Sequence, residues 1–351
     1  MDDIRTGLSY GDALLVPKHS GVDSRDEVDL STYLTDDLPL EVPLLSAPMD
    51  TVTERETAVA LSEAGGFGTI HRFLAVEEQA AEVRAASEAG ARVGAALGID
   101  EATVERAEAV VEAGTDCLML DVAHGHLEAC LDATSDVAAE FPSLPLVAGN
   151  VATAEGVADL AAAGADCVKV GIGPGSHCTT RKVAGAGVPQ LTAVDDCADA
   201  AAAHGVRTIA DGGIRSSGDA VKALMAGADT VMMGSLFAGT DEAPMPVVEV
   251  DGERYKRSRG MATTAAAEGR SDKESAPTAD EGVEALTPYK GPLADVVREF
   301  CAGIRSGLSY CGGHGLAEAR DRAEFIRVAP AAKELEGAHL DRDWEGVDVG
   351  D

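Results

Sequence analysis

A glycine-rich segment presents one cysteine directly after a short apolar stretch, and it is the strongest candidate for chemistry in the chain. The segment Gly171–Arg181 has the sequence GIGPGSHCTTR and follows the apolar stretch Cys167–Val170. Glycines adopt backbone conformations closed to other residues and let a ligand or an ion approach closely. Cys178 has hydroxyl groups and Arg181 beside it, surroundings that suit a thiolate nucleophile. The alternative is a buried structural thiol, which we favour for the other six cysteines.

The elements that must position Cys178 are short apolar runs that alternate with alanine-rich stretches. Near-continuous apolar strands separated by helices indicate parallel pairing with both faces covered. Glycine signals such as Glu112–Asp116, Ala162–Asp166 and Met225–Asp229 end three of the helices. We therefore predict an α/β fold, a single (β/α)8 TIM-barrel domain over residues 1–351, with an open doubly wound sheet as the alternative. The eight predicted strands are Val42–Ala47, Phe67–Ile70, Arg92–Leu97, Cys117–Ala123, Pro145–Val151, Cys167–Ile172, Arg207–Gly212 and Thr230–Gly234.

In such a barrel the chemistry belongs to the loops at the carboxyl ends of the strands. The loops after the seventh and eighth strands often bind phosphate through backbone N–H groups. Asp211, after the seventh strand, is an acceptor suited to a ribose diol, and a turn aspartate is the alternative. The polar or glycine-rich strand exits are Ser46–Asp50, Asp121–Gly125, Gly149–Asn150, Gly173–Thr180, Asp211–Gly213 and Gly234–Ser235.

Residues 251–291 interrupt the alternation with charged, small and proline residues. We predict a strand pair followed by a mobile active-site flap within this segment, and then a helix from about Leu293 to Arg305. A solvated linker is the alternative. The position between the eighth strand and a final helix favours a flap, since such lids exclude water and complete active sites.

The charge is extreme, with 61 acidic and 28 basic residues and a formal net charge of −33. Such a surface repels nucleic acid and anionic membranes, so we expect neither as a partner. Salt screens the self-repulsion, which suggests a halophilic protein. Seven cysteines without regular spacing argue against a disulfide framework or a zinc site and for a reducing compartment. Without an apolar signal region or a membrane-length apolar run, the chain is expected to be cytoplasmic.

Several motifs in one order resemble the IMP dehydrogenase/GMP reductase family from about Gly11 to Val328. Ordered motifs of this length are far more specific than a lone glycine signature. The matching segments are Asp12–Pro17, Ser46–Thr53, Gly173–Arg181, Asp211–Gly218, Gly234–Ser235, Arg259–Met261 and Tyr289–Gly291.

The resemblance implies that the Cys178 thiolate attacks C2 of a purine nucleotide and that a nicotinamide cofactor exchanges hydride with the purine. It also implies a homotetramer and a potassium (K+) site made by the carbonyls of Gly173, Gly175 and Cys178. Asp121, Gly149 and Asn150 would meet the dinucleotide. The nucleotide would be held by Ser46, Ser176, Asp211, Gly212, Gly213, Gly234, Ser235, Arg259, Gly260 and Met261.

Three features depart from the common pattern of this family. Ser258 replaces a frequent tyrosine, and Arg72 replaces a usual lysine. The short stretch between Ile70 and Arg92 leaves no room for the regulatory domain that many of the dehydrogenases insert there, and reductases of the family lack it.

The two family reactions differ after the shared cysteine step. A dehydrogenase hydrolyses a covalent adduct and uses an Arg-Tyr pair of the flap as base. The 20-residue spacing from Met261 to Glu281 is short, and this stretch contains Arg270 but no tyrosine. A reductase expels ammonia instead, and its Thr-Glu pair corresponds to Thr180 and Glu281.

We therefore predict a GMP reductase that uses NADPH, with an NAD-dependent IMP dehydrogenase as the alternative. The segments Ser46–Asp50, Val188–Gln190 and Gly234–Thr240 look closer to dehydrogenases and favour that alternative. Two other classes stay open. A nucleotide-binding regulator would not need the intact Cys178 and Thr180, and a flavin- or phosphate-binding barrel enzyme would not need the cysteine loop.

Overall fold

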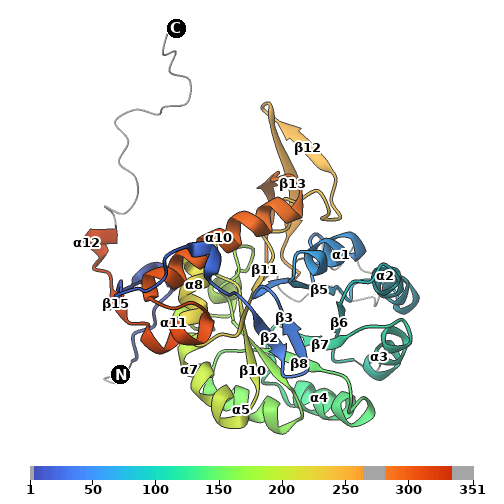
Figure 1. Cartoon of the computed structure of the whole chain (residues 1–351). Helices are drawn as coiled ribbons and strands as arrows, with labels where there is room; N and C mark the ends of the chain where they lie inside the picture. The colour runs from blue at the N-terminus through green and yellow to red at the C-terminus, as the bar shows by residue number, and fades with distance from the viewer. Residues whose placement is uncertain (1–3, 101, 262, 264–280, 334–351) are drawn as a thin grey trace.

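Eight parallel strands close into a barrel in the order β10-β11-β4-β5-β6-β7-β8-β9 (Figure 1). The computed structural model describes residues 4–100, 102–261, 263 and 281–333. The strands are β4 (Leu44–Ser46), β5 (Phe67–Ile70), β6 (Val93–Leu97), β7 (Cys117–Asp121), β8 (Leu146–Val151), β9 (Cys167–Val170), β10 (Arg207–Asp211) and β11 (Thr230–Met233). The predicted (β/α)8 barrel is confirmed, and the open-sheet alternative is wrong because β11 pairs with β4 and closes the ring.

Helices lie around the barrel, between successive strands (Figure 1). The predicted glycine stops are present, since Gly114, Gly164 and Gly227 have φ of 95°, 104° and 114°. A left-handed residue ends a helix at little cost when it is glycine. The helices are α1 (Arg55–Glu63), α2 (Val76–Glu88), α3 (Thr103–Glu112), α4 (Glu128–Glu140), α5 (Ala154–Ala162), α6 (Thr180–Val183), α7 (Gln190–His204) and α8 (Ser217–Met225).

One end of the barrel is closed by the antiparallel pair β2 (Thr32–Thr35) and β3 (Leu38–Leu40). Leucines of this pair are buried with side chains from inside the barrel, among them Phe67 and Cys167. The ion pair between Arg207, the first residue of β10, and Asp36, in the turn between β2 and β3, places these two strands at the amino ends of the barrel strands. The carboxyl ends therefore form the open end, where the predicted site residues gather.

A three-stranded antiparallel sheet follows the barrel: β12 (Val247–Val250), β13 (Glu253–Arg259) and β14 (Glu284–Pro288). The sequence predicts only a strand pair here. The third strand has four exposed residues of five and ends in proline, so its pattern resembles a loop. Residues 262 and 264–280, the larger part of the predicted flap, lie outside the described residues.

Helix α10 (Leu293–Cys311) begins where the sequence predicts and runs beyond Arg305. Its buried side chains include Val297, Ile304 and Leu308, which form an apolar stripe at helical spacing. The helix ends where Gly312 takes φ of 79°. Glycine is required at position 307 inside the helix, because a Cβ there would lie only 2.5 Å from a methyl group of Val221.

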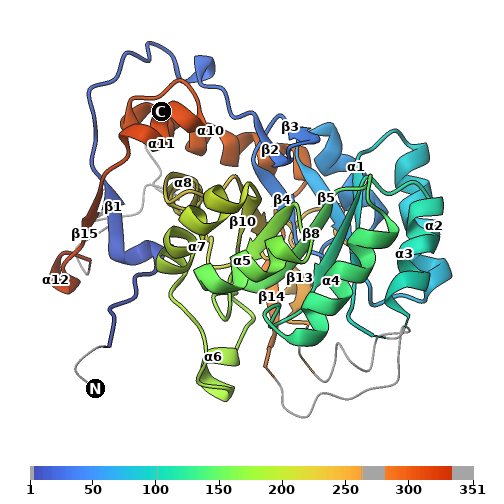
Figure 2. The ribbon, with the colours of Figure 1, turned by 90° about the horizontal axis from the view of Figure 1, so that it is seen from below.

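The two ends of the described chain meet beside the barrel. Strand β1 (Ala13–Leu15) pairs with β15 (Phe325–Arg327) in an antiparallel ladder, which Figure 2 shows apart from the barrel strands. The remaining elements are η1 (Tyr10–Asp12), η2 (Arg25–Glu27), α11 (Leu316–Arg322) and α12 (Pro330–Lys333). Within the described part of the chain, no helix combines the length and apolar character needed to span a membrane.

Candidate active site

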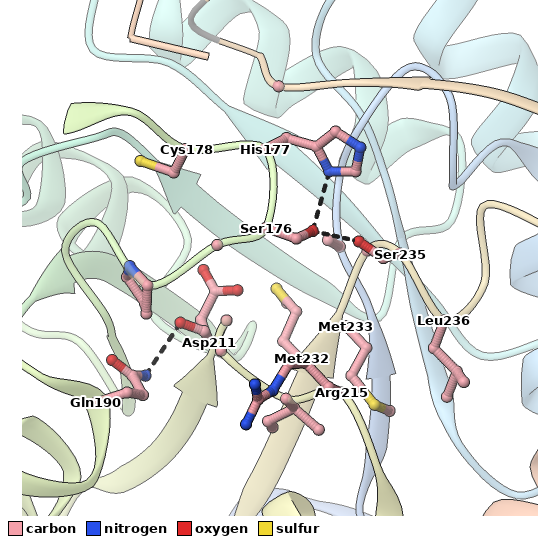
Figure 3. A pocket seen from close by; sticks show the side chains of 18 of the residues that line it. Ser176, His177, Cys178, Gln190, Asp211, Arg215, Met232, Met233, Ser235 and Leu236 are labelled. Carbon is pink, nitrogen blue, oxygen red and sulfur yellow. Dashed lines mark hydrogen bonds between the residues drawn. The ribbon is translucent and has the colours of Figure 1, made fainter. Parts of the chain in front are cut away.

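A cavity of about 620 Å³ opens at the carboxyl ends of the barrel strands (Figure 3). A second cavity of about 310 Å³ adjoins it, and both are lined by Cys178, Thr180 and Asp211. The predicted substrate and catalytic residues that line the larger cavity are Ser176, Cys178, Thr180, Asp211, Gly212, Gly213, Gly234, Ser235, Gly260, Met261 and Glu281. Cys178 therefore lies where a substrate in one cavity can meet a second ligand in the other.

Cys178 begins a chain of three side chains. Its Sγ lies 3.1 Å from Thr180 Oγ1, and the Thr180 hydroxyl donates to Glu281 Oε2 at 2.7 Å. Because a hydroxyl has one proton to donate, the thiol donates to Thr180 while Thr180 donates to the carboxylate. The arrangement provides a proton path between the sulfur and a carboxylate.

Backbone hydrogen bonds hold the cysteine loop next to Glu281, the last member of this series of side chains. Thr179 N–H donates to Glu281 O at 2.9 Å, and Val283 N–H donates to His177 O at 2.9 Å. Gly212 allows the cysteine loop to approach the loop after β10, because a Cβ there would lie 3.2 Å from Gly175 N. The cysteine loop, the residues around Glu281 and the loop after β10 thus hold one another in place.

All seven cysteines are in the described part of the chain, and Cys178 differs from the other six. It is partly exposed and the other six are buried. Burial raises the pKa of the Cys197 thiol to about 12 and that of Cys301 to about 11. These thiols are protonated at neutral pH and inaccessible, as expected for structural cysteines.

Lys169, on strand β9 before the cysteine loop, lines the smaller cavity. Its side chain is only 2% exposed, and its Nζ lies 2.6 Å from Asp121 Oδ1 and 2.8 Å from Asp211 Oδ2. Asn150 donates to Asp211 Oδ2 at 2.8 Å and also contacts Lys169. Burial lowers the pKa of Lys169, but attraction by Asp121 and Asp211 outweighs it, so the pKa lies above its usual value. The ammonium group is therefore charged at neutral pH and holds the two carboxylates.

Two serine hydroxyls and a lysine line the larger cavity beside β11. Ser176 Oγ and Ser235 Oγ lie 2.5 Å apart, and Lys290 Nζ donates to Leu236 O at 3.0 Å. Hydroxyls, an ammonium group and the backbone of Gly213 and Gly234 in one place suit a phosphate group.

The sequence and the fold are similar to those of known proteins. A model of the IMP dehydrogenase / GMP reductase domain matches residues 7–339. The chain belongs to this family. An inosine-5′-monophosphate dehydrogenase of Nitrosopumilus maritimus is 35% identical, with 94% of this chain and 97% of the relative covered. A GMP reductase of Leishmania major is 34% identical, with 95% and 96% covered. A solved GMP reductase variant of Trypanosoma brucei in complex with guanosine 5′-monophosphate is 32% identical with a TM-score of 0.92, covering 97% of this chain and 99% of that one.

Members of the IMP dehydrogenase/GMP reductase family are oxidoreductases that act on purine nucleotides with a nicotinamide cofactor. The alignments with the dehydrogenase and the reductase span 462 and 475 residues, whereas this chain has 351. Relatives of both names therefore contain segments without a counterpart here. The absence of the regulatory insertion therefore does not distinguish a reductase from a dehydrogenase, although the sequence alone favours a reductase on this ground.

Three predicted ligand residues line neither cavity. Ser46 is fully buried, and its Oγ lies 2.8 Å from Thr53 Oγ1. Arg259 pairs with Asp50, its Nε 2.9 Å from Oδ2. Gly149 is buried under Lys169, where a Cβ would lie 2.6 Å from the Lys169 carbonyl oxygen. The structure thus places them behind the cavity walls, and their direct contact with ligands stays a prediction.

The smaller cavity contains two of the residues predicted to meet the dinucleotide. Asp121 and Asn150 line it, as the sequence predicts, and Phe73 adds an aromatic ring. Gly173 and Gly175 line it as well, and the Gly175 carbonyl accepts the Cys178 N–H at 3.1 Å. The predicted K+ site stays a prediction. In the described part of the chain, no cluster of three or more His, Cys, Asp or Glu side chains could hold a metal ion.

The sequence reasoning missed two polar residues of this site. Lys169 lies within an apolar stretch of the sequence, and a lysine inside a buried strand must find an opposite charge. Gln190, at the start of α7, donates to Val170 O at 2.8 Å and to Asp211 O at 3.0 Å. No hydrogen-bond partner of its Oε1 is present among the described residues. Gln190 lines the larger cavity and holds the backbone of Asp211 in the cavity wall.

Lys169→Met is expected to lower the free energy of unfolding by about 3 kcal/mol, because two half-buried carboxylates lose the buried cation that they share. The raised pKa means that this stabilisation is complete below the ordinary lysine pKa of about 10.4 and is lost only at more alkaline pH. Urea unfolding at pH 7 and constant KCl measures it. Lys18→Met is the control, since the exposed Lys18–Glu324 pair is worth at most about 1 kcal/mol. Equal losses in both variants would contradict the assignment.

Proposed function

We propose that this protein is a GMP reductase, which converts GMP to IMP and ammonia with NADPH. The observation that supports this most is the chain from Cys178 through Thr180 to Glu281 in the larger cavity. Expulsion of an amine requires a proton at the leaving nitrogen, and this chain can supply it. The sequence of residues 262–280 contains no tyrosine, so the Arg-Tyr base expected of a dehydrogenase flap is missing from it.

Side chains of the protein account for the first half of the reaction. Cys178 attacks C2 of the purine and forms a C–S bond, and the bond between C2 and the amine nitrogen then breaks. The proton that Cys178 gives up passes through the Thr180 hydroxyl to Glu281, which returns it through the same hydroxyl to the departing nitrogen, so the nitrogen leaves as ammonia. NADPH, when bound, supplies the hydride that replaces sulfur at C2. IMP is then released, and Cys178 is left as a free thiolate.

The binding groups follow from the two cavities. Asp211 would accept from the ribose hydroxyls, and Ser176 and Ser235 would donate to the phosphate. Asp121 and Asn150 of the smaller cavity would hold the dinucleotide near Cys178. These roles rest on the cavity geometry and on the family to which the chain belongs.

IMP dehydrogenase is the second candidate, with oxidation of IMP to XMP by NAD. Relatives with that name are about as similar as the reductases, at 35% against 34% identity. The sequence around Gln190 also favours it. This reaction needs a base that activates water, and Arg270 would have to act without a tyrosine partner.

Two parallel assays of the purified protein in high KCl test the proposal, one with GMP and NADPH and one with IMP and NAD⁺. We expect ammonia and IMP from GMP over many turnovers. With IMP and NAD⁺ we expect at most a burst of about one reduced cofactor per site, because hydrolysis lacks its general base, worth about 10²–10⁴-fold. Steady formation of XMP, without ammonia from GMP, would identify a dehydrogenase. A bound flavin or no turnover of either nucleotide would favour the other classes.

We also propose that the protein is a cytoplasmic homotetramer adapted to high salt and uses K+. At a net charge of −33, self-repulsion is weakly screened at 0.01 M salt, where the Debye length is about 30 Å, and strongly at 1 M, where it is about 3 Å. The melting temperature is therefore expected to rise between 0.1 M and 2 M KCl. A flat or falling melting temperature would reject adaptation to salt. Higher activity in KCl than in NaCl would support the K+ site, and equal activity would contradict it.

A further inference from the structure

His177 lies in the middle of a continuous chain of hydrogen-bonded side chains that ends at the larger cavity. Its Nε2 lies 2.9 Å from Ser258 Oγ, and its Nδ1 lies 3.1 Å from Ser176 Oγ. Ser258 Oγ lies 2.7 Å from Thr287 Oγ1, and Ser176 Oγ lies 2.5 Å from Ser235 Oγ. Figure 3 shows the His177 ring directed toward Ser176 and Ser235, on the side of the loop away from the Cys178 sulfur. The chain thus joins the sheet β13–β14 to the hydroxyls of the cavity wall.

The His177 ring has one donor and one acceptor nitrogen at neutral pH. Burial lowers the pKa of His177, so the ring is neutral. A neutral imidazole that bonds through both nitrogens must donate at one and accept at the other. The chain therefore has two possible directions, and something at its end must choose between them.

An anion in the cavity fixes the direction of the chain. Phosphate oxygens of a dianion only accept, so Ser176 and Ser235 must both donate their protons to it and give up the hydrogen bond between their two hydroxyls. Ser176 Oγ then needs a donor of its own, and only Nδ1–H of His177 reaches it in the chain described above. Nε2 must in turn accept from Ser258, whose oxygen accepts from Thr287. Every member then has a partner, and all protons point toward the anion.

We propose that His177 is a positioning residue for the 5′-phosphate of the substrate, which it recognises by holding the Ser176 hydroxyl in its donating orientation. The small Ser258, which stands where a tyrosine is frequent in the family, leaves room for the imidazole and anchors it. Ser258 is buried, with 2% exposure, so water does not compete for that hydrogen bond. The inference rests on the proposed function only in taking a purine nucleoside monophosphate as the ligand, and it holds for GMP and IMP alike.

The first test is the affinity of His177→Phe for GMP and IMP, measured by calorimetry without a dinucleotide. The phenyl ring keeps the packing and removes both nitrogens. We expect dissociation constants about tenfold higher, the effect of one hydrogen bond. Inhibition by guanosine, which has no phosphate, is expected to stay within twofold, and kcat within about threefold while KM rises. His204→Phe, at the exposed end of α7, is the control and should change nothing.

Two further comparisons separate positioning from a structural role. His177→Asn places its amide near the Nδ1 position and should retain most of the GMP affinity, whereas His177→Gln should lose it. Ser258→Ala should weaken GMP binding less than His177→Phe and add nothing in the double variant, because Ser258 acts through the imidazole. If His177→Phe fails to fold, the Asn and Gln pair decides.

Equal loss of GMP and guanosine affinity would show a structural role, and unchanged GMP affinity in His177→Phe or in both amide variants would overturn the proposal. These binding readouts do not depend on the direction of the reaction. A dehydrogenase activity would therefore contradict the proposed function without touching the role of His177. Failure of the wild-type protein to bind either monophosphate would contradict both.

Discussion

Cys178→Ala and Cys178→Ser are expected to reduce turnover by at least about 10³-fold, while GMP binding stays within about tenfold of wild type. The sulfur forms the covalent bond to C2, and without it the barrier rises by several kcal/mol. Serine keeps the shape, but its hydroxyl is a far weaker nucleophile at neutral pH. Steady-state rates with GMP and NADPH, together with calorimetric GMP titrations, measure the two effects separately.

Buried cysteines provide the matched controls. Cys117→Ala and Cys167→Ala remove a sulfur from the barrel interior, where both side chains are fully buried. We expect lower melting temperatures and nearly unchanged kinetics at a temperature where the variants are folded. A Cys178 variant with more than a tenth of wild-type activity would rule out covalent catalysis by this residue.

The barrel could be predicted because its pattern is local. Each strand is a short apolar run next to a helix that ends in glycine, and both signals lie within a few residues of one another. The bounds are less certain. The strand expected over Val42–Ala47 pairs only over Leu44–Ser46, since apolar residues continue past the hydrogen-bonded ladder where they are still buried.

The candidate site could be predicted only in part. Residues in glycine-rich strand exits, such as Cys178 and Asp211, have local signals and do line the cavity. The partnership of Lys169 with Asp121 and Asp211 joins residues 48 and 42 positions apart. No local pattern indicates which distant side chains will pair, so the charge network and the chain through His177 appear only in three dimensions.

The choice between reductase and dehydrogenase cannot be made from the residues that bind the substrate. Both use the same nucleophile and nucleotide, so the residues that bind the substrate carry no information about the second step. That information lies in the groups that deliver or remove protons near C2. Thr180 and Glu281 are the described groups of that kind, which makes their replacement the most direct probe of the proposed chemistry.

Glu281→Gln and Thr180→Val are each expected to slow ammonia release from GMP by about 10²–10⁴-fold, the usual worth of a positioned proton donor. Glutamine accepts the Thr180 hydrogen bond as glutamate does but has no proton to deliver. Valine keeps the volume of threonine and removes the hydroxyl that lies 3.1 Å from the sulfur and 2.7 Å from the carboxylate. Rapid-quench measurement of ammonia from enzyme and GMP isolates this step from hydride transfer.

The two losses should not add, because either change breaks the same proton path. The double variant is expected to be about as slow as the slower single variant, and GMP should bind all three proteins within a few-fold of wild type. Glu284→Gln is the control, since its carboxylate pairs with the exposed Arg257 on the sheet and not with Thr180. Additive losses would mean that Thr180 and Glu281 act separately. Ammonia release at the wild-type rate in Glu281→Gln would exclude the carboxylate as the proton source, and with it the observation on which the reductase proposal mainly depends.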